Sequence, residues 1–371
     1  MTRRLWLHAG TMKSGTSFLQ NVLALNKPAL LEREGLLFPG KRWQQQVNGV
    51  MEIIEYGGAN QPPMPADGKW AGVVADVQQH PGDAIISVEF IGPRMEGKIE
   101  QLLASFPDHD VQVVFTVRDL ARNIPAMWQE SVQNGSTCTW PEFQERVRKH
   151  KRRDEGPGAW FWKQQDLAGM MARWQKVVGN DHLTVVTVPP RGSEPGLLWR
   201  RFASVIGIDP ASCDTTVRAN PSIGVASAML LRELNVRLQA DGLSTEDYHQ
   251  RVKHLLAKKG LATRSGEPTL GLDADWVRRR GHEQVDKLRK LRLRVVGDLA
   301  ELEPQPVAGV STEQVSVEDQ LAAAVDGLAF LVHEWPARRA KLQAQLKRQQ
   351  GHAPQRPPAR PAAHTPEERP A

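Results

Sequence analysis

Residues 5–17 read Leu5-Trp6-Leu7-His8-Ala9-Gly10-Thr11-Met12-Lys13-Ser14-Gly15-Thr16-Ser17, and this stretch decides the fold. Its first part, residues 5–9, is a short apolar run that ends at a glycine, which predicts a buried strand. Apolar side chains then recur at helical spacing over residues 18–25, and Lys27-Pro28 predicts the end of that helix. The glycine-flanked turn between them aims several backbone N–H groups at one point, next to the positive end of the helix dipole. The stretch therefore predicts an anion-binding loop between a strand and a helix.

The same pattern of buried strands and amphipathic helices continues outward from this stretch. Three further strands are predicted, over residues 84–88, 111–117 and 183–188, and helical patterns lie between them, notably over 167–178 and 197–206. Such alternation is typical of an α/β fold in which helices cover both faces of a parallel sheet, giving three layers. Because ligands bind at the carboxyl ends of such strands, chemistry is expected in the loops that follow Ala9, Val88 and Val117.

The second half of the chain is mainly helical. Helices are predicted over residues 225–238, 245–257, 276–293 and 316–335, the last ended by Pro336, with a short strand over 293–296. From residue 349 the chain is rich in Pro, Arg, Ala and Gln and lacks apolar residues for a core. We therefore expect an α/β nucleotide-binding core over 1–222, a helical C-terminal region over 223–348 and a disordered tail over 349–371.

Composition sets the broad class of the protein. The chain has 371 residues, of which 40% are hydrophobic and 24% charged, as in soluble globular proteins. Its two cysteines, Cys138 and Cys213, have no CxxC or histidine partners, so neither a disulfide framework nor a zinc site is indicated. The N-terminal apolar run is too short for a signal sequence, and no later run is long enough to span a membrane. A cytoplasmic location is expected.

The net charge of +6 leaves the nature of the partner open between nucleic acid, anionic lipid and a phosphorylated ligand. Much of the excess lies within residues 278–294 and in the tail after Pro336. Within 278–294 the basic residues alternate with Val285, Leu288 and Leu291, which is typical of the solvated face of an amphipathic helix. No nucleic-acid partner is therefore expected.

The chemistry of the loop lies in residues 10–17, here called the nucleotide loop. Lys13 supplies a cation, Ser14, Thr16 and Ser17 supply hydroxyl groups, and Gly15 gives the turn its freedom. It is not a Walker A loop, because the lysine precedes the second glycine instead of following it. Residues 12–20, Met-Lys-Ser-Gly-Thr-Ser-Phe-Leu-Gln, resemble the 5′-phosphosulfate loop of the sulfotransferase family, usually Pro-Lys-Ser/Thr-Gly-Thr-Thr/Ser before an apolar helix. Met12 replaces the frequent proline.

This resemblance, to the bacterial branch of the family and with decreasing specificity up to about residue 304, implies a P-loop-like site for 3′-phosphoadenosine 5′-phosphosulfate. It implies no metal. In the family an arginine at the end of a strand and a serine along the following helix hold the 3′-phosphate. Arg118 matches the arginine, and its guanidinium suits bidentate phosphate binding. The serine position falls on Ala126, so either Ser131 substitutes for it or the contact is absent.

The candidate general base is Glu89, just past the strand predicted over 84–88. Several branches of the family use a glutamate in this region, whereas the cytosolic small-molecule branch uses a histidine. A carboxylate facing the acceptor can remove its hydroxyl proton during transfer. His8 and His80 are the alternatives, although His8 fits a strand histidine satisfied within the core. The Trp160-Phe161-Trp162 triplet either lines an acceptor cleft or packs against the sheet.

The resemblance thus implies transfer of a sulfuryl group from the nucleotide donor to a hydroxyl or amine acceptor, with Lys13 and Glu89 as catalytic residues. Two other functions stay open at this point: a P-loop kinase or NTPase, which would need Mg²⁺ and a lysine after the second glycine, and a non-catalytic scaffold with the same fold, which Ala126 favours and Lys13 opposes. The acceptor and the oligomeric state cannot be read, since one fold serves many acceptors.

Overall fold

The computed structural model describes residues 3–56, 66–150, 155–217 and 222–351. At its centre are five parallel strands, in the order β2-β1-β3-β4-β5. Their bounds are β1 Arg3–His8, β2 Ala84–Ser87, β3 His109–Val117, β4 Leu183–Thr187 and β5 Arg294–Val296. All five lie at or within two residues of the predicted segments, and the predicted α/β fold with a parallel sheet is confirmed.

Alternate residues of the strands face two different helical layers, because side chains of a strand point to opposite faces of the sheet. Leu5 and Leu7 of β1 pack into one core, and Trp6 between them packs into the other. The first layer contains α3 Trp43–Ile53, α4 Lys69–Gln79, α5 Glu96–Leu103, α9 Leu167–Val178 and α13 Asp275–Leu291. The second contains α1 Thr16–Leu25, α2 Lys27–Glu34 and α10 Leu197–Ile206. These are the three predicted layers.

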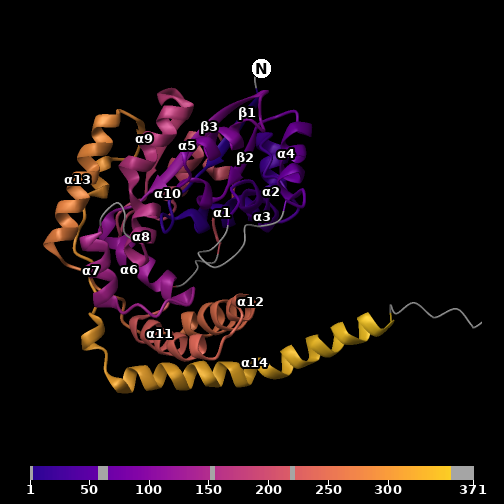
Figure 1. The fold of residues 1–371 in the computed structure, drawn as a ribbon. Coiled ribbons are helices and arrows are strands. Elements are labelled where there is room, and N and C mark those ends of the chain that lie inside the picture. The colour runs from indigo at the N-terminus through magenta and orange to yellow at the C-terminus, as the bar shows by residue number, and fades with distance from the viewer. Residues whose placement is uncertain (1–2, 57–65, 151–154, 218–221, 352–371) are drawn as a thin grey trace, which may run out of the picture.

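A third apolar cluster forms a helical lobe at the carboxyl edge of the sheet, beneath the sheet in Figure 1. Its helices come from both halves of the chain: α6 Leu120–Gln133, α7 Trp140–Lys149, α8 Pro157–Gln165, α11 Val225–Ala240 and the π-helix η4 Tyr248–Gly260. Short helical turns complete the chain: η1 Glu89–Ile91, η2 Asn180–His182, η3 Pro210–Ser212, α12 Thr245–Asp247, η5 Leu261–Thr263, η6 Leu299–Leu302 and η7 Thr312–Gln314. The lobe faces the loops in which chemistry is expected.

The region after residue 222 contributes to the sheet as well as to the lobe, because β5 and α13 both belong to the sheet layers. Its last helix, α14 Val317–Gly351, does not end at Pro336, so that prediction was wrong. A proline inside a helix removes one N–H bond and crowds the carbonyl four residues earlier. Here that carbonyl belongs to Val332, whose residue is 71% exposed, so water can satisfy it and the helix continues. Residues 352–371 of the predicted disordered tail lie outside the described residues.

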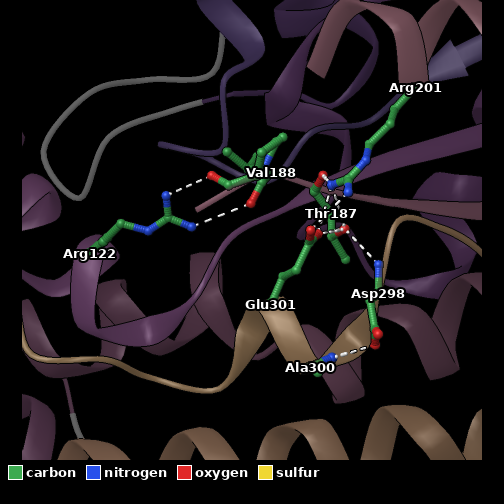
Figure 2. A network of polar contacts seen from close by, with 8 residues as sticks. Arg122, Thr187, Val188, Arg201, Asp298, Ala300 and Glu301 are labelled. Atoms are coloured by element: carbon green, nitrogen blue, oxygen red, sulfur yellow. Dashed lines mark hydrogen bonds and ion pairs between the residues drawn. The ribbon is translucent and has the colours of Figure 1, made fainter. Parts of the chain in front are cut away.

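A polar network holds the carboxyl ends of β4 and β5 together (Figure 2). Arg201 of α10 donates to both carboxylate oxygens of Glu301 at 2.7 and 2.8 Å, and to the carbonyl of Thr187 at 3.0 Å. Gly297 passes so close that a Cβ there would lie 2.0 Å from the Thr187 hydroxyl. Only glycine fits, which accounts for its place in the segment 295–299.

Within the described residues, no helix is long and apolar enough to cross a membrane.

Candidate active site

The nucleotide loop runs from β1 directly into α1, as predicted. Its backbone adopts the left-handed conformation at three positions: Gly10 with φ 69°, Lys13 with φ 63° and Gly15 with φ 76°. Lysine seldom adopts this conformation, so the surrounding structure must hold it there. The N–H of Thr11 extends the β1–β3 ladder by donating to the carbonyl of Thr116 at 2.7 Å. The loop is therefore fixed to the sheet at its start and turns into α1 through these left-handed residues.

The backbone N–H groups of residues 12–17 donate no hydrogen bond to any acceptor in the described parts of the chain. They lie where α1 begins, and no side chain caps that helix. Unpaired N–H groups at a helix N-terminus, next to left-handed turns, are the donors that bind phosphate and sulfate groups. The hydroxyls of Thr11 and Ser14 lie 2.6 Å apart and are buried, Thr16 is buried, and Ser17 is exposed. The loop therefore offers the backbone donors and hydroxyl groups that an anion cradle needs, and anion binding there stays a prediction.

The Lys13 ammonium donates to Glu130 of α6 at 2.7 Å. The carboxylate of Glu130 also accepts from Lys253 of η4 at 3.2 Å. Burial would raise the pKa of Glu130, but the ammonium groups of Lys13, Lys253 and Lys258 outweigh burial and hold the pKa far below its ordinary value. Burial lowers the pKa of Lys258, and Glu130 and Glu89 oppose that shift. A cluster of three lysines and two carboxylates thus adjoins the nucleotide loop.

Two amide side chains hold the loop from the helical lobe. Gln165, at the end of α8, donates to the carbonyl of Met12 at 2.9 Å, and Asn123 of α6 donates to Gln165 at 2.8 Å. Both side chains are almost completely buried. These two hydrogen bonds hold the backbone at Met12, directly before Lys13. They therefore fix the position from which the Lys13 side chain extends.

Arg118 follows β3 and donates to the carbonyl of Lys13 at 3.1 Å. Its pKa is lowered to about 10, chiefly by burial and also by the charges of Arg122 and Arg191, which Asp119 opposes. Arg122 is occupied, because it pairs with Asp119 and donates to the carbonyls of Pro189 and Val188 at 2.9 and 3.3 Å (Figure 2). Two guanidinium groups, Arg118 and Arg191, thus lie near each other, and no ion pair to either occurs among the described residues. Such a site attracts an anion.

The helix that follows Arg118 does not point Ser131 at the loop. The Ser131 hydroxyl donates to the carbonyl of Trp128 in its own helix at 2.7 Å. Its neighbour Glu130 reaches Lys13 instead, because consecutive residues of a helix point in different directions. The structure therefore brings Arg118 to the nucleotide loop, but not Ser131, and Ala126 offers no polar group in its place.

Glu89 begins η1, directly after β2, and lies against the nucleotide loop. A Cβ at Gly10 would lie 2.5 Å from the Cβ of Glu89, so glycine is needed for the two segments to approach. Gln20 of α1 donates to the Glu89 carboxylate at 2.9 Å and to the carbonyl of Ser87 at 3.2 Å. Glu89 thus lies against the loop that carries Lys13, at the carboxyl edge of the sheet.

The two histidine alternatives are placed elsewhere. His8 is fully buried within β1, where its ring nitrogens lie 2.7 Å from the Ser87 hydroxyl and 3.1 Å from the Thr116 hydroxyl. Burial lowers its pKa to about 3. His80 precedes β2 at the amino edge of the sheet, opposite the nucleotide loop, and lies 3.0 Å from the carbonyl of Gly35. Neither histidine is therefore placed as Glu89 is, against Gly10 of the nucleotide loop.

Several residues at this site have no signal in the sequence. Glu130, Gln165 and Lys253 reach the loop from far along the chain, and nothing in their local patterns predicts it. In the Trp160-Phe161-Trp162 triplet, Phe161 is fully buried, but in the lobe and not against the sheet, whereas Trp162 is half-buried and lines a cleft. Cys138 and Cys213 are free thiols, and no group of three or more His, Cys, Asp or Glu residues in the described parts is placed to hold a metal ion.

Comparison with known proteins gives one structural likeness. No family model matches the chain, and no curated protein matches it. Among solved structures, the crystal structure of a sulfotransferase from Alicyclobacillus acidocaldarius aligns with 67% of this chain and 95% of its own, at 15% sequence identity and a TM-score of 0.41. That protein belongs to the family that the nucleotide loop of this chain resembles.

Proposed function

We propose that this protein transfers a sulfuryl group from 3′-phosphoadenosine 5′-phosphosulfate to a hydroxyl or amine acceptor. The observation that carries the proposal is the combination of free N–H groups over residues 12–17 with the ammonium of Lys13 at the start of α1. The donor supplies an activated sulfate whose bridging oxygen becomes negative as the sulfur–oxygen bond breaks. A preorganised set of donors stabilises charge of this kind.

Lys13 is the residue placed to neutralise the leaving oxygen. Its side chain is 29% exposed and its ammonium is already bound to a carboxylate, so it can exchange one anionic partner for another without leaving its position. The free N–H groups, with Ser14, Gly15, Thr16 and Ser17, hold the non-bridging oxygens. Removal of one such donor from a preorganised site costs about 10²–10³-fold in turnover.

Arg118 and Arg191 are the proposed contacts of the 3′-phosphate. They follow β3 and β4, whereas Glu89 follows β2 on the other side of β1, so they lie on the side of the loop away from Glu89. Arg118 also holds the Lys13 carbonyl, which links binding at the 3′ end to the position of the loop. The contribution of Ser131 stays a prediction, which a Ser131→Ala variant tests.

Glu89 is the proposed general base. Gln20 orients its carboxylate through one oxygen, which leaves the other oxygen to accept the acceptor's proton as the new oxygen–sulfur bond forms. The burial of Ser87 and the close packing at Gly10 fix the backbone position of Glu89, and so limit how far its carboxylate can move.

Calorimetric titration with adenosine 3′,5′-bisphosphate tests the proposal. We expect binding without added Mg²⁺, a raised melting temperature, and much weaker binding of ATP with Mg²⁺. A preference for ATP with Mg²⁺ would instead support a kinase or NTPase. Tight binding of the bisphosphate with no acceptor found in a broad screen would support a non-catalytic scaffold.

A further inference from the structure

A cleft outside the nucleotide loop lies on the outer side of the first helical layer. It is a cleft of about 680 Å³ between the start of α5, the end of α8 and the faces of α9 and α13. Clefts of about 300–1,000 Å³ are the size that binds small molecules. Its lining is basic and includes one aromatic ring: Arg94, Trp162, Lys163, Arg173, Arg280 and Lys287.

The positive charge of this cleft is largely uncompensated. Arg280 pairs with Glu283 at 3.5 Å, and Asp166 is used to cap α9 by accepting from Gly169 at 3.1 Å. Among the described residues, no carboxylate lies within ion-pair distance of the other four cations: Arg94, Lys163, Arg173 and Lys287. Four like charges around one hollow repel each other, and an anionic ligand relieves that repulsion.

Two of the cations that line the cleft, Arg94 and Arg173, are half-buried. Arg94 donates through Nε to the carbonyl of Phe90 at 2.9 Å, and Arg173 donates through Nε to the carbonyl of Arg94 at 3.4 Å. Their terminal nitrogens make no hydrogen bond to other described residues. Burial lowers the pKa of the Lys163 amine, and the nearby guanidinium of Arg94 lowers it further. Lys163 and Arg94 thus line the same cleft, near enough for their charges to act on each other.

The basic face of α13 belongs to this cleft. Arg280 and Lys287 are seven residues apart, or two helical turns, and therefore project from the same face. Arg280 lies over the ring of Trp162, 5.8 Å from its centroid. The charge that sequence patterning assigns to a solvated face is, at these two positions, aimed into a hollow.

The cleft is connected to the active site through two short segments. Asp166 and Lys163 flank Gln165, whose amide holds the nucleotide loop at Met12. Arg94 follows Glu89 by five residues, through η1 and the turn that ends it, so the two residues lie at most about 17 Å apart, at roughly 3.4 Å per residue. A molecule that presents a hydroxyl to Glu89 can therefore extend into the cleft.

We propose that this cleft binds a carboxylate or sulfate group of the acceptor, so that the protein acts on anionic hydroxyl compounds, with Arg94 and Lys163 as the residues that select them. The inference rests on the proposed sulfuryl transfer, because it takes Glu89 as the reacting end of the acceptor site. Arg173 holds the backbone of Arg94, and Trp162 supplies a surface for a ring.

The test uses two probes that differ in one group: para-nitrophenyl glucuronide, which carries a carboxylate, and para-nitrophenyl glucoside, which carries a hydroxymethyl group there. Ligand-observed NMR measures binding of each to the full chain saturated with adenosine 3′,5′-bisphosphate. We expect the glucuronide to bind at least about tenfold more tightly, the smaller end of what a charge-assisted hydrogen bond contributes. Arg94→Gln and Lys163→Gln should each reduce this preference severalfold and leave bisphosphate binding unchanged.

Lys98→Gln is the matched control. Lys98 also lines the cleft, but its ammonium is bound to Glu55 at 2.5 Å, so its loss should leave the preference intact. Equal binding of the two probes, or a preference that survives in both the Arg94 and Lys163 variants, would overturn the proposal while bisphosphate binding still stands. Failure of the bisphosphate to bind would overturn the acceptor role together with the proposed function, whatever the probes do.

Discussion

The Nζ of Lys13 lies 2.7 Å from Oε2 of Glu130, a carboxylate 117 residues further along the chain. Glu130 is 14% exposed and is ionised at neutral pH, since the surrounding lysines hold its pKa far below the ordinary value despite burial. The ammonium that we assign to the leaving oxygen is therefore already bound to an anion of the protein itself. A donor that enters the loop must replace Glu130 or share Lys13 with it.

Replacing this carboxylate by a neutral amide should strengthen nucleotide binding. In Glu130→Gln, Lys13 and Lys253 lose their counter-charge, and the phosphates of adenosine 3′,5′-bisphosphate supply it instead. We expect its dissociation constant to fall by roughly tenfold, about 1.4 kcal/mol. We expect the free protein to be less stable by about 1–3 kcal/mol, because two ammonium groups stay without a partner. Calorimetric titration and urea unfolding measure the two effects.

Glu96→Gln serves as the control for that change, because Glu96 is bound to Lys176 on the surface of the sheet layers. The same substitution there should alter neither quantity by more than a few tenths of a kcal/mol. Weaker nucleotide binding in Glu130→Gln would mean that Glu130 positions Lys13 for the donor and does not compete with it.

His8 should make the protein less stable in mild acid. Its pKa is about 3 in the folded state and about 6.5 when the chain is unfolded. Between these values the unfolded chain binds a proton that the folded chain refuses, so this group lowers the free energy of unfolding by about 1.4 kcal/mol for each pH unit below 6.5. Above pH 6.5 it has no effect. Urea unfolding from pH 7.5 to 4.5 should show a smaller slope in His8→Gln than in the wild type. His80→Gln, at the other edge of the sheet, should keep the wild-type slope.

The sequence was sufficient for the strand, the loop and the helix over residues 5–25, because apolar periodicity and glycine placement are local properties. It was equally sufficient for the position of Glu89, which follows a strand whose carboxyl end must face the same edge as the loop, while its role stays a prediction. Glu130 and Gln165 could not be predicted, since they reach the loop across 117 and 153 residues through the packing of α6 and α8. The helix end predicted at Pro336 was wrong for a different reason. The free-energy cost of a proline within a helix depends on whether water reaches the carbonyl that it leaves unpaired, and a local sequence pattern does not give that exposure.

Arg118 should discriminate between nucleotides by their 3′-phosphate. We expect Arg118→Ala to weaken binding of adenosine 3′,5′-bisphosphate by roughly 1.5–3 kcal/mol, the contribution of a hydrogen bond to a charged group. For adenosine 5′-phosphosulfate, which lacks the 3′-phosphate, the loss should be much smaller, because the guanidinium has nothing to hold. Calorimetric titration of both nucleotides gives the comparison. Equal losses would show that Arg118 acts only by holding the Lys13 carbonyl.

Lys13 and Glu89 should fail in different ways if they act on opposite sides of the transferred group. Lys13→Ala should reduce turnover more than ground-state donor affinity, because the charge on the leaving oxygen develops only in the transition state. Glu89→Gln should leave bisphosphate binding unchanged and lower the transfer rate by roughly 10²–10⁴-fold, since it removes only the proton acceptor. Both measurements need an acceptor, found by screening hydroxyl and amine compounds with radiolabelled donor. Glu89→Gln also keeps the hydrogen bond with Gln20 possible, so that a loss of rate is not a loss of structure. Full activity in Glu89→Gln would remove it as the base, and because His8 is buried and His80 lies at the opposite edge, Lys258, which senses the charge of Glu89, would be the next residue to test.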